Sequence, residues 1–588
     1  MKRLLLPLGL LVLGASAAVP ACGAPGEEDV EDDTGEDAYT TEGKCDGLPR
    51  LKNLQTPPGV CVGVVASGFT FARGIAELDT GDLILAEMGG WALDRGGVWL
   101  LRRNADKTYS KTKLNALIDK PSGVAVGPDG LPYIGTPSAI YRFDPYAATL
   151  KSDPTKRLAK TGPLAGPDAY KQPRLELVVR NLPGDGRHPL KKFVFDKRDP
   201  WTMFVNVGSA SDNCEQGRGA VPPSGFPLPC VEAEGAADGA PRSAIRKYVL
   251  DGPNHVATSF TTYAKGLRNS MALAVHPTSN VLVQGENARD SINKHDASLT
   301  DQEGDLPHEE LNVIEQGGHY GWPYCFDNGT PSPEYRGRVD CARYKNPALL
   351  LPGHASPLGL AYYTGEMFPQ AYRNNLLVTY HGYRANGHRL ALVPVDARGV
   401  PGGGEPLDVI RGWEKSADGR DPQGAPVDVL VAKDGSIYLT EDKNGTVLRV
   451  VFDRAAGNGA PMRPIPPAQP VVSADERARC DALARRTDAF SRVQRDVIDA
   501  ACVGCHGLGP GYAGGLALLK CDAIGNAQRL TAARPGGRGA YVVAGDLRSE
   551  LVLRLKGEGY PQMPAGGVSP EQLDEVETWI RQGARVPQ

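Results

Sequence analysis

Between about residue 46 and residue 455 the chain repeats one short pattern, in which apolar and polar residues alternate, turn and alternate again. Residues 121–130 read Pro-Ser-Gly-Val-Ala-Val-Gly-Pro-Asp-Gly and lead to a second alternating stretch that closes at 140–143. Residues 426–435 follow the same course to Asp-Gly and continue through 436–450. Alternation predicts strands, and Asp-Gly predicts a tight turn between them, because glycine tolerates a positive φ.

Weaker copies of this pattern surround residues 81–85, 193–195, 273–275 and 376–378. About six such units predict a mainly β protein, a six-bladed β-propeller in which four-stranded sheets repeat around an axis. We expect the propeller to span residues 46–456. Because the spacing between units is irregular, long loops should project from one face, and a functional site is expected on those loops.

The N-terminal residues follow a different pattern. Met1-Lys2-Arg3 precedes a short apolar run, so residues 1–21 are predicted to be a secretory signal peptide. Residues 19–22, Val-Pro-Ala-Cys, resemble a bacterial lipobox, which would make Cys22 a lipidated N-terminus; ordinary cleavage is the alternative. Residues 22–45 are acidic and poor in apolar groups, which predicts a tether. No later run is apolar and long enough for a transmembrane helix.

The C-terminal residues are predicted to be helical. Residues 457–472 are rich in proline and alanine and predict a semi-extended linker before a small all-α domain at 473–588. A helix is expected from Phe490 to Ala501. Ser569-Pro570-Glu571-Gln572 forms a capping box with proline at the first helical position, and an apolar stripe follows it.

The most specific motif lies in this α domain. Cys502 and Cys505, followed by His506, form a C-x-x-C-H run, which can attach a haem through two thioethers and offer an imidazole to the iron. Met563 is the only methionine after Ser473, so it is the candidate sixth ligand. A zinc or disulfide C-x-x-C is the alternative, but zinc needs more His or Cys ligands than this segment offers. We therefore expect a cytochrome c domain carrying covalent haem c.

The remaining cysteines indicate an exported protein. Of 11 cysteines, those left after Cys22 and the haem pair are even in number, as expected for disulfides. Proximity alone suggests four local couples: Cys45 with Cys61, Cys214 with Cys230, Cys325 with Cys341, and Cys480 with Cys521.

Composition adds two limits. A chain of 588 residues can bury several cores, and a net charge of -4 with 23% charged residues gives no sign of nucleic-acid binding. The 71 glycines and 49 prolines fit a fold with many turns.

Several motifs together carry a resemblance to a known family. Gly-Leu-Arg-Asn at 266–269 precedes Asn-Ala-Arg-Asp at 287–290, and Glu-Leu-Asn at 310–312 precedes Tyr-Gly-Trp-Pro-Tyr-Cys at 320–325. Over most of residues 55–452 the chain resembles the soluble PQQ-dependent glucose and sorbosone dehydrogenases, the sorbosone branch most. The resemblance implies a six-bladed propeller that binds PQQ and Ca²⁺ and oxidises sugars at the anomeric carbon.

The resemblance also implies roles for particular residues. His188 matches the general base, and a neutral imidazole can take the proton of the anomeric hydroxyl. Ser209 stands where the glucose dehydrogenases carry an Asp that orients the base, as in the sorbosone branch. Arg268 and Asn269 match residues near the quinone carbonyls, where an arginine can bind a carboxylate and stabilise charge on the reduced cofactor.

Three further stretches match the edge of the pocket. The turn at 287–290 corresponds to a loop whose backbone carbonyls hold Ca²⁺ in relatives, and oxygen ligands suit this ion; a plain β-turn is the alternative. The calcium-binding residues implied are Ala288, Arg289 and Asp290, and the further cofactor contacts implied are His354, His381 and Arg384.

Two departures from the family pattern bear on function. Ala425 stands where relatives have an arginine, so PQQ loses a carboxylate partner unless Arg384 or Arg420 replaces it. This predicts a functional but easily stripped PQQ site. The segment 291–305 is longer than in relatives, which predicts altered access for the substrate.

The sequence therefore predicts an exported, lipid-anchored quinohaem oxidoreductase on the periplasmic or cell-surface side of a bacterial membrane. His188 would deprotonate an aldose or related sugar aldehyde, PQQ would accept hydride, and electrons would pass to haem c and then to a downstream acceptor, a cytochrome or the respiratory chain. One alternative is a sugar- or protein-binding propeller with a decayed cofactor site, fused to an electron-carrier cytochrome. Another is a calcium-dependent propeller hydrolase, which would not need the fused haem.

Overall fold

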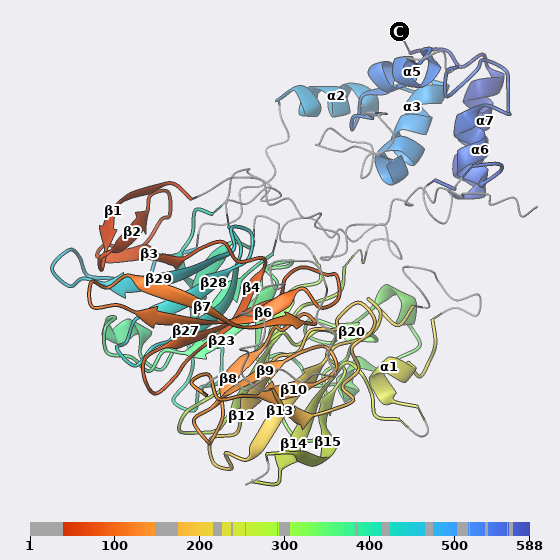
Figure 1. The fold of residues 1–588 in the computed structure, drawn as a ribbon. Coiled ribbons are helices and arrows are strands. Elements are labelled where there is room, and N and C mark those ends of the chain that lie inside the picture. Colours follow the sequence, from red (N-terminus) through yellow and green to blue (C-terminus); the bar gives the residue numbers. More distant parts are fainter. Residues whose placement is uncertain are drawn as a thin grey trace, which may run out of the picture. The chain divides into compact units, whose positions relative to one another are not determined.

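The computed structural model describes most of the chain after residue 38. The described ranges are 39–147, 175–215, 226–236, 239–252, 255–290, 292, 306–382, 386–413, 424–464, 474–502, 516, 518–534, 539–560, 562–563 and 568–587. The chain divides near residue 472 into two compact units, one built of strands and the other of helices (Figure 1).

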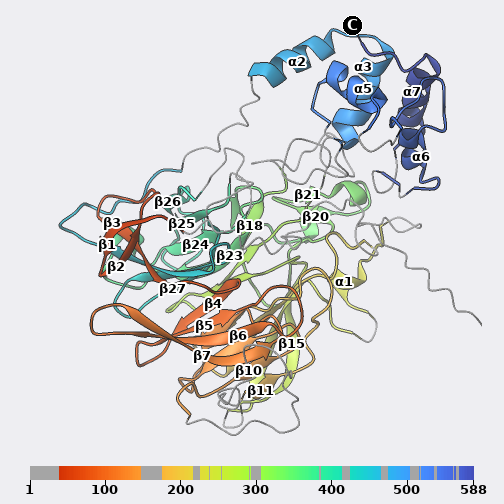
Figure 2. The same ribbon diagram turned by 45° about the horizontal axis from the view of Figure 1, so that its top comes forward.

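Six sheets arranged around an axis form the first unit (Figures 1 and 2). Blade 1 contains β4 (Ala72–Glu77), β5 (Leu83–Glu87), β6 (Gly96–Arg103) and β7 (Tyr109–Ile118). Blade 2 contains β8 (Val124–Val126), β9 (Pro132–Gly135), β10 (Ile140–Arg142) and β11 (Glu176–Val179). Blade 3 contains β12 (Phe193–Phe195), β13 (Thr202–Val207), β14 (Ala244–Leu250) and β15 (Ala257–Lys265), with β19 (Gly318–His319) at its edge.

The other three blades complete the ring. Blade 4 contains β16 (Ala272–Val275), β17 (Leu282–Glu286), β18 (Glu309–Val313) and β22 (Leu349–Leu351), and blade 5 contains β23 (Pro357–Tyr362), β24 (Leu376–Tyr380), β25 (Arg389–Val393) and β26 (Leu407–Ile410). Blade 6 contains β27 (Pro426–Val431), β28 (Ile437–Glu441), β29 (Thr446–Phe452) and the early strand β3 (Val60–Ala66). A two-stranded ribbon, β20 (Cys325–Phe326) and β21 (Thr330–Pro331), lies outside the blades.

The ring closes by pairing an N-terminal strand with the last strands of the propeller. β3 pairs antiparallel with β29, from Phe452 opposite Val60 to Val447 opposite Ala66. The inner strands β4, β8, β12, β16, β23 and β27 contact one another in a closed circle. The predicted six-bladed propeller is confirmed, and the two Asp-Gly turns lie where expected, with φ of 77° at Gly130 and 83° at Gly435.

Both ends of the propeller extend beyond the boundaries expected from sequence. β1 (Thr41–Cys45) and β2 (Leu48–Leu51) add an antiparallel pair to blade 6, so the last residues of the expected tether belong to a sheet. Residues 457–464, expected to be linker, contact the propeller: the backbones of Asp408 and Met462 exchange hydrogen bonds of 2.7 and 2.8 Å. Composition missed both segments because backbone pairing does not require apolar side chains.

All four predicted disulfides are confirmed: Cys45–Cys61, Cys214–Cys230, Cys325–Cys341 and Cys480–Cys521. Three of them join cysteines 16 residues apart, so proximity in the sequence was a sufficient guide. The second of these holds a short helix, α1 (Val231–Glu234), against blade 3.

The second unit is helical, with α2 (Ala474–Ala484), α3 (Ala489–Val493), a π-helical segment η6 (Gln494–Cys502), α5 (Ala523–Thr531), α6 (Glu550–Lys556) and α7 (Pro570–Arg581). The predicted capping box at Ser569 and Gln572 is confirmed. Phe490 and Trp579 join α3 to α7 with ring centroids 4.5 Å apart, in a core of their own. No helix in the described ranges is long and apolar enough to cross a membrane.

Candidate active site

The predicted site residues of the propeller gather on one face. Because neighbouring strands of a blade are antiparallel, the inner strands begin on the same face at which the second strands end; we call it the entry face. His188 and Arg268 precede the inner strands β12 and β16, and the loop 287–290 and His381 follow the second strands β17 and β24. The topology thus brings four distant stretches of sequence to one rim.

His188 is buried, and its ring is held by one neighbour. Nδ1 lies 2.9 Å from both the carbonyl oxygen and the hydroxyl oxygen of Ser209. That hydroxyl donates its hydrogen to the Ser211 carbonyl at 2.6 Å, so both Ser209 oxygens act as acceptors toward the ring. Nδ1 therefore carries the proton, and Nε2 keeps its lone pair. Gly208 is required here, because a Cβ at this position would lie 2.5 Å from the Cβ of His188.

The protonation state of His188 follows from its surroundings. Burial and the charge of Arg268 hold the pKa of the imidazole well below its usual value. The ring is consequently neutral at physiological pH, with a bare nitrogen that can accept a proton.

Arg268 is fixed at the centre of an ionic cluster and is only 1% exposed. Its Nε and Nη2 donate to Asp212 Oδ1 at 3.0 and 2.7 Å, Nη2 also donates to Asp290 at 3.0 Å, and Nη1 donates to the carbonyl of Asn287 at 3.0 Å. Although burial opposes it, the charge of Arg268 lowers the pKa of Asp212 to about 2. Asp212 was not predicted, and no sequence signal distinguishes it from other aspartates in turns.

The predicted calcium loop is built into the same cluster. Ala288 N donates to Glu309 at 2.6 Å, and Asp290 N donates to Asp212 at 3.0 Å. The side chain of Arg289 points to Glu334, which it binds through two nitrogens at 2.7 Å each. Within the described part of the chain, no three His, Cys, Asp or Glu side chains converge so that they could hold a metal ion.

Oxygen atoms suited to a hard cation nevertheless lie next to this loop. Asn269 Oδ1 and Asn287 Oδ1 are buried and have no hydrogen-bond donor among the described residues. The amide of Asn287 is oriented by its Nδ2, which donates to the carbonyls of Asn269 and Pro357 at 3.3 and 3.0 Å. Buried acceptors without a donor are costly unless another group satisfies them.

His354 and His381 lie on adjoining segments. Backbone hydrogen bonds from His381 to Ser356 and from Gly382 to Ala355 join the two stretches at 3.1 and 3.0 Å. Gly382 permits this approach, because a Cβ there would lie 2.0 Å from the carbonyl oxygen of His354. Arg384, the third predicted residue of this group, lies outside the described residues.

A second ionic cluster includes His381 and an arginine that was not predicted. His381 Nε2 lies 3.0 Å from Asp442, and Arg73 Nη2 lies 3.2 Å from the same carboxylate. The Nε of Arg73 is buried and has no acceptor among the described residues. Asp442 N lies 3.4 Å from the carbonyl of Ala425, so the residue whose carboxylate binds Arg73 is hydrogen-bonded to the position where the sequence resemblance led us to expect an arginine.

The side chain at position 425 is buried. It is 0% exposed, and its backbone N–H donates to Glu441 at 2.8 Å. Arg420, the other substitute considered from sequence, lies outside the described residues.

An apolar layer and an ion pair join different blades of the propeller. The apolar layer draws Met88, Leu190, Met271, Leu358 and Val427 from five blades, with Phe71 and Trp91 packed against it. Directly beside it, Lys192 of blade 3 binds Asp428 of blade 6 at 2.7 Å, both buried. Separating the two residues would leave two uncompensated buried charges, so this ion pair stabilises the arrangement of blades 3 and 6.

Two buried glutamates face each other between β17 and β18. Glu286 and Glu310 are directly opposite in the sheet, and Glu286 accepts the backbone N–H of Asn269 at 3.1 Å. Burial raises the pKa of Glu286 to about 7 and that of Glu310 to about 8. At neutral pH the pair therefore retains a proton, which relieves the repulsion between the two carboxylates.

In the helical unit, two of the four predicted haem residues are described. Cys502 ends η6 and packs against the helical core, and Met563 donates its backbone N–H to the Arg554 carbonyl at 2.9 Å. Cys505 and His506 lie outside the described residues.

Comparison with known proteins identifies the fold of the propeller. The family model described as TrAA12-like matches residues 231–452. The PQQ domain of a pyranose dehydrogenase from Coprinopsis cinerea superposes with a TM-score of 0.50 at 18% identity, covering 69% of this chain and 99% of that domain. The fold is that of a PQQ-dependent sugar dehydrogenase propeller.

Curated relatives match over shorter stretches. A PQQ-dependent sugar dehydrogenase of Hypocrea jecorina is 24% identical over 357 residues, which is 54% of this chain and 71% of the relative. An uncharacterised protein of Borreliella burgdorferi is 27% identical over 202 residues, 32% of this chain. The chain spans about half, 48%, of the length of that second protein.

Proposed function

We propose that this protein is a sugar oxidoreductase that uses PQQ and Ca²⁺ on its propeller and delivers electrons to a c-type haem on its helical unit. The observation that carries the proposal is the buried His188, with its proton on Nδ1, a bare Nε2, and a pKa lowered by burial and by the charge of Arg268. A neutral, oriented imidazole next to a fixed cation suits removal of a hydroxyl proton during oxidation of an alcohol or hemiacetal.

The residues of the entry face fit a cofactor that carries several carboxylates. Arg268 and Arg73 are buried cations that precede or begin inner strands, and Arg73 keeps an Nε donor with no acceptor among the described residues. Guanidinium groups bind carboxylates through paired hydrogen bonds. Asn269, His354 and His381 would complete the cofactor contacts. Bound PQQ would supply an ortho-quinone that accepts a hydride from the sugar.

Calcium fits the buried amide oxygens near the loop 287–290. Asn269 Oδ1 and Asn287 Oδ1 lack donors among the described residues, and oxygen atoms are the ligands that Ca²⁺ prefers. Backbone carbonyls of Ala288, Arg289 and Asp290 would add to them. Bound Ca²⁺ would supply a Lewis acid able to polarise a quinone.

His188 would then act on a bound aldose or related sugar aldehyde. Nε2 accepts the proton of the anomeric hydroxyl while hydride leaves the same carbon, and the Nδ1–H bond to Ser209 steadies the imidazolium that forms.

Electrons would leave through the second unit. The C-x-x-C-H run at Cys502, Cys505 and His506 fits a covalent haem, and Met563 is the candidate sixth ligand. Carrying the acceptor on the same chain keeps it at a high effective concentration. A downstream cytochrome or respiratory chain would reoxidise the haem.

The location we propose is the periplasmic or cell-surface side of a bacterial membrane, with Cys22 as a lipid anchor. Four disulfides support an oxidising compartment. The residues of the leader and anchor, 1–22, lie outside the described residues.

A binding propeller with a decayed cofactor site is the second candidate. It is favoured by the buried Ala425, which offers no cation where relatives have one. Reconstitution of the purified protein with PQQ and Ca²⁺ separates the two candidates: the oxidoreductase binds PQQ and reduces its haem on addition of an aldose. Calorimetry that detects no PQQ binding in the presence of Ca²⁺ would favour the binding propeller.

A further inference from the structure

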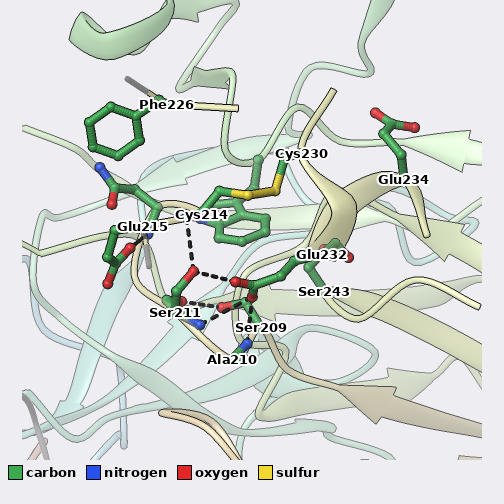
Figure 3. Close-up of a disulfide and its surroundings, with 12 residues drawn as sticks. Ser209, Ala210, Ser211, Cys214, Glu215, Phe226, Cys230, Glu232, Glu234 and Ser243 are labelled. Carbon is green, nitrogen blue, oxygen red and sulfur yellow. Dashed lines mark hydrogen bonds between the residues drawn. A yellow bond between two sulfur atoms is a disulfide. The ribbon is translucent and has the colours of Figure 1, made fainter. Parts of the chain in front are cut away.

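The loop that holds His188 is itself held by a carboxylate that lies 22 residues after Ala210 in the chain. Glu232, on α1, accepts the backbone N–H of Ala210 at 2.6 Å and that of Ser211 at 3.1 Å through Oε2. Its Oε1 accepts the hydroxyl of Ser211 at 2.6 Å. Figure 3 shows Glu232 directed at Ala210 and Ser211, next to the disulfide between Cys214 and Cys230.

One peptide group connects this carboxylate to the catalytic ring. The carbonyl of Ser209 accepts the proton of His188 Nδ1, and the N–H of the same peptide, that of Ala210, donates to Glu232. The two ends of a trans peptide point in opposite directions, so the peptide lies between the imidazole and the carboxylate. Hydrogen bonds arranged in series polarise one another, and a negative charge at one end makes the carbonyl at the other end a better acceptor.

The remaining charges around His188 do not supply this stabilisation. Arg268 and Arg187 disfavour a charged ring, and Asp212, which favours it, is committed to Arg268. Arg187 itself lies 3.7 Å from Glu215. Ser209 occupies the position next to the ring where a carboxylate could have bound it directly, and Glu232 provides a carboxylate one peptide further away.

The disulfide fixes α1 in this position. Cys230 is the residue before α1, and its partner Cys214 donates its backbone N–H to the Ser211 hydroxyl at 2.9 Å. The Ser243 hydroxyl donates to the Glu232 carbonyl at 3.3 Å. The carboxylate is therefore delivered by a short helix whose two ends are tied to the loop and to blade 3.

We propose that Glu232 is a positioning residue of the reaction, acting through the peptide between Ser209 and Ala210 to orient His188 and to stabilise its protonated form. The inference rests on the proposed role of His188 as a base. It assigns to α1 and its disulfide the task that an adjacent aspartate performs for a histidine base in other enzymes.

The test compares Glu232→Gln with Glu234→Gln in the full-length protein. Glutamine at 232 retains an oxygen for the two backbone N–H groups, removes the charge, and replaces the oxygen that accepts the Ser211 hydroxyl with an amide NH2. Glu234 lies on the same helix but binds Lys265 and His319 instead, so its variant controls for loss of a charge on α1 (Figure 3).

The first readout needs neither cofactor nor sugar. In protein labelled with ¹⁵N-histidine, at neutral pH, the Nδ1 proton of His188 is assigned with the His188→Asn variant. We expect Glu232→Gln to move this resonance upfield, because the hydrogen bond to Ser209 weakens, and Glu234→Gln to leave it in place. An unchanged resonance in Glu232→Gln, or equal changes in both variants, would overturn the proposal.

The second readout uses the protein loaded with PQQ and Ca²⁺. Glu232→Gln should lower kcat/KM for the sugar by about tenfold, with PQQ affinity retained, and Glu232→Asp should recover part of the loss. If the resonance moves but neither the variants nor the unaltered protein oxidises a sugar, the effect of Glu232 on His188 is confirmed and the proposed function is wrong. Equal losses of activity in the Glu232→Gln and Glu234→Gln variants would contradict the proposed role of Glu232.

Discussion

His188 illustrates how neighbouring groups set the chemistry of one side chain. An exposed imidazole takes up a proton at about pH 6.5 and exchanges between two tautomers. In this protein burial and Arg268 keep the ring neutral, and two acceptors on Ser209 keep its proton on Nδ1. The residue type was predictable as a base, but its usable nitrogen is decided by Ser209.

His188→Asn should abolish reduction of the haem by sugar while PQQ still binds. The base acts on the substrate proton, and removing a general base costs about a hundredfold to ten-thousandfold in rate. Stopped-flow spectra of the haem measure the rate, and calorimetry measures PQQ affinity. Loss of PQQ binding together with unchanged activity of the bound fraction would show that His188 holds the cofactor instead.

The pH dependence should reflect the lowered pKa of His188. Because the neutral ring is the active form, kcat/KM should stay level as the pH falls through about 6.5 and decline only at more acid pH. The free energy of unfolding should change in the same direction. Below about pH 6.5 the histidine of the unfolded chain binds a proton while the folded His188 does not, so the free energy of unfolding decreases as the pH is lowered. An acid limb of kcat/KM centred at or above pH 6.5 contradicts this assignment.

Arg73→Gln tests whether this arginine replaces the cation missing at Ala425. Loss of one charge-assisted hydrogen bond to a carboxylate should weaken PQQ binding about tenfold to a hundredfold. Calorimetry with Ca²⁺ present measures the change, and Arg102→Gln, on the outer part of blade 1, serves as control. Ala425→Arg, by contrast, is expected to lower the melting temperature, because residue 425 is fully buried.

At the scale of elements, the entry face depends on loops that brace one another. The segment after β13 supplies Asp212 and Ser209, the segment before β16 supplies Arg268, and the loop after β17 supplies Asp290. Each of these three loops contributes one charge to a shared ionic cluster. A substitution in one loop should therefore disturb the others.

Asp212→Asn should destabilise the propeller by about 3 kcal/mol, since it leaves Arg268 buried with a weaker partner. Urea unfolding followed by tryptophan fluorescence measures the loss. Asp290→Asn is the matched control: its carboxylate binds the same guanidinium but is 27% exposed, so a smaller loss is expected. Equal losses of unfolding free energy would mean that the deeper burial of Asp212 does not increase its contribution to stability.

At the scale of the whole molecule, the helical unit has its own core and its own disulfide, Cys480–Cys521. It is separate from the propeller in the chain as well, since the division falls near residue 472. Two compact units of this kind are consistent with oxidation of substrate on one and electron transfer on the other.

If the helical unit carries the proposed haem, Met563→Ala should leave that haem covalently attached but without its sulfur ligand. The haem potential should fall, because thioether ligation favours the reduced iron, and transfer from the propeller should slow. Redox titration and the visible spectrum measure both effects, with Met462→Ala, in the segment that pairs with Asp408, as control. A wild-type spectrum and potential in Met563→Ala would exclude Met563 as the ligand.

The sequence by itself determined the features that depend on nearby residues. Alternation and Asp-Gly turns predicted the strands of the six blades. Cysteines 16 residues apart form disulfides, and the capping box at Ser569 marks the start of α7. It misplaced the two ends of the propeller, where β1 and the 457–464 segment are held by backbone pairing that composition does not reveal.

Only the tertiary structure decided which groups meet on the entry face. Arg268 and Asp212 are 56 residues apart, His381 and Asp442 are 61 apart, and Lys192 and Asp428 are 236 apart. Each of these pairs joins different blades, so the packing of the blades around the axis creates the contact and no local pattern encodes it. Glu232 is the clearest case: it binds Ala210 and Ser211 only because a disulfide and blade 3 bring α1 to the loop that also carries Ser209.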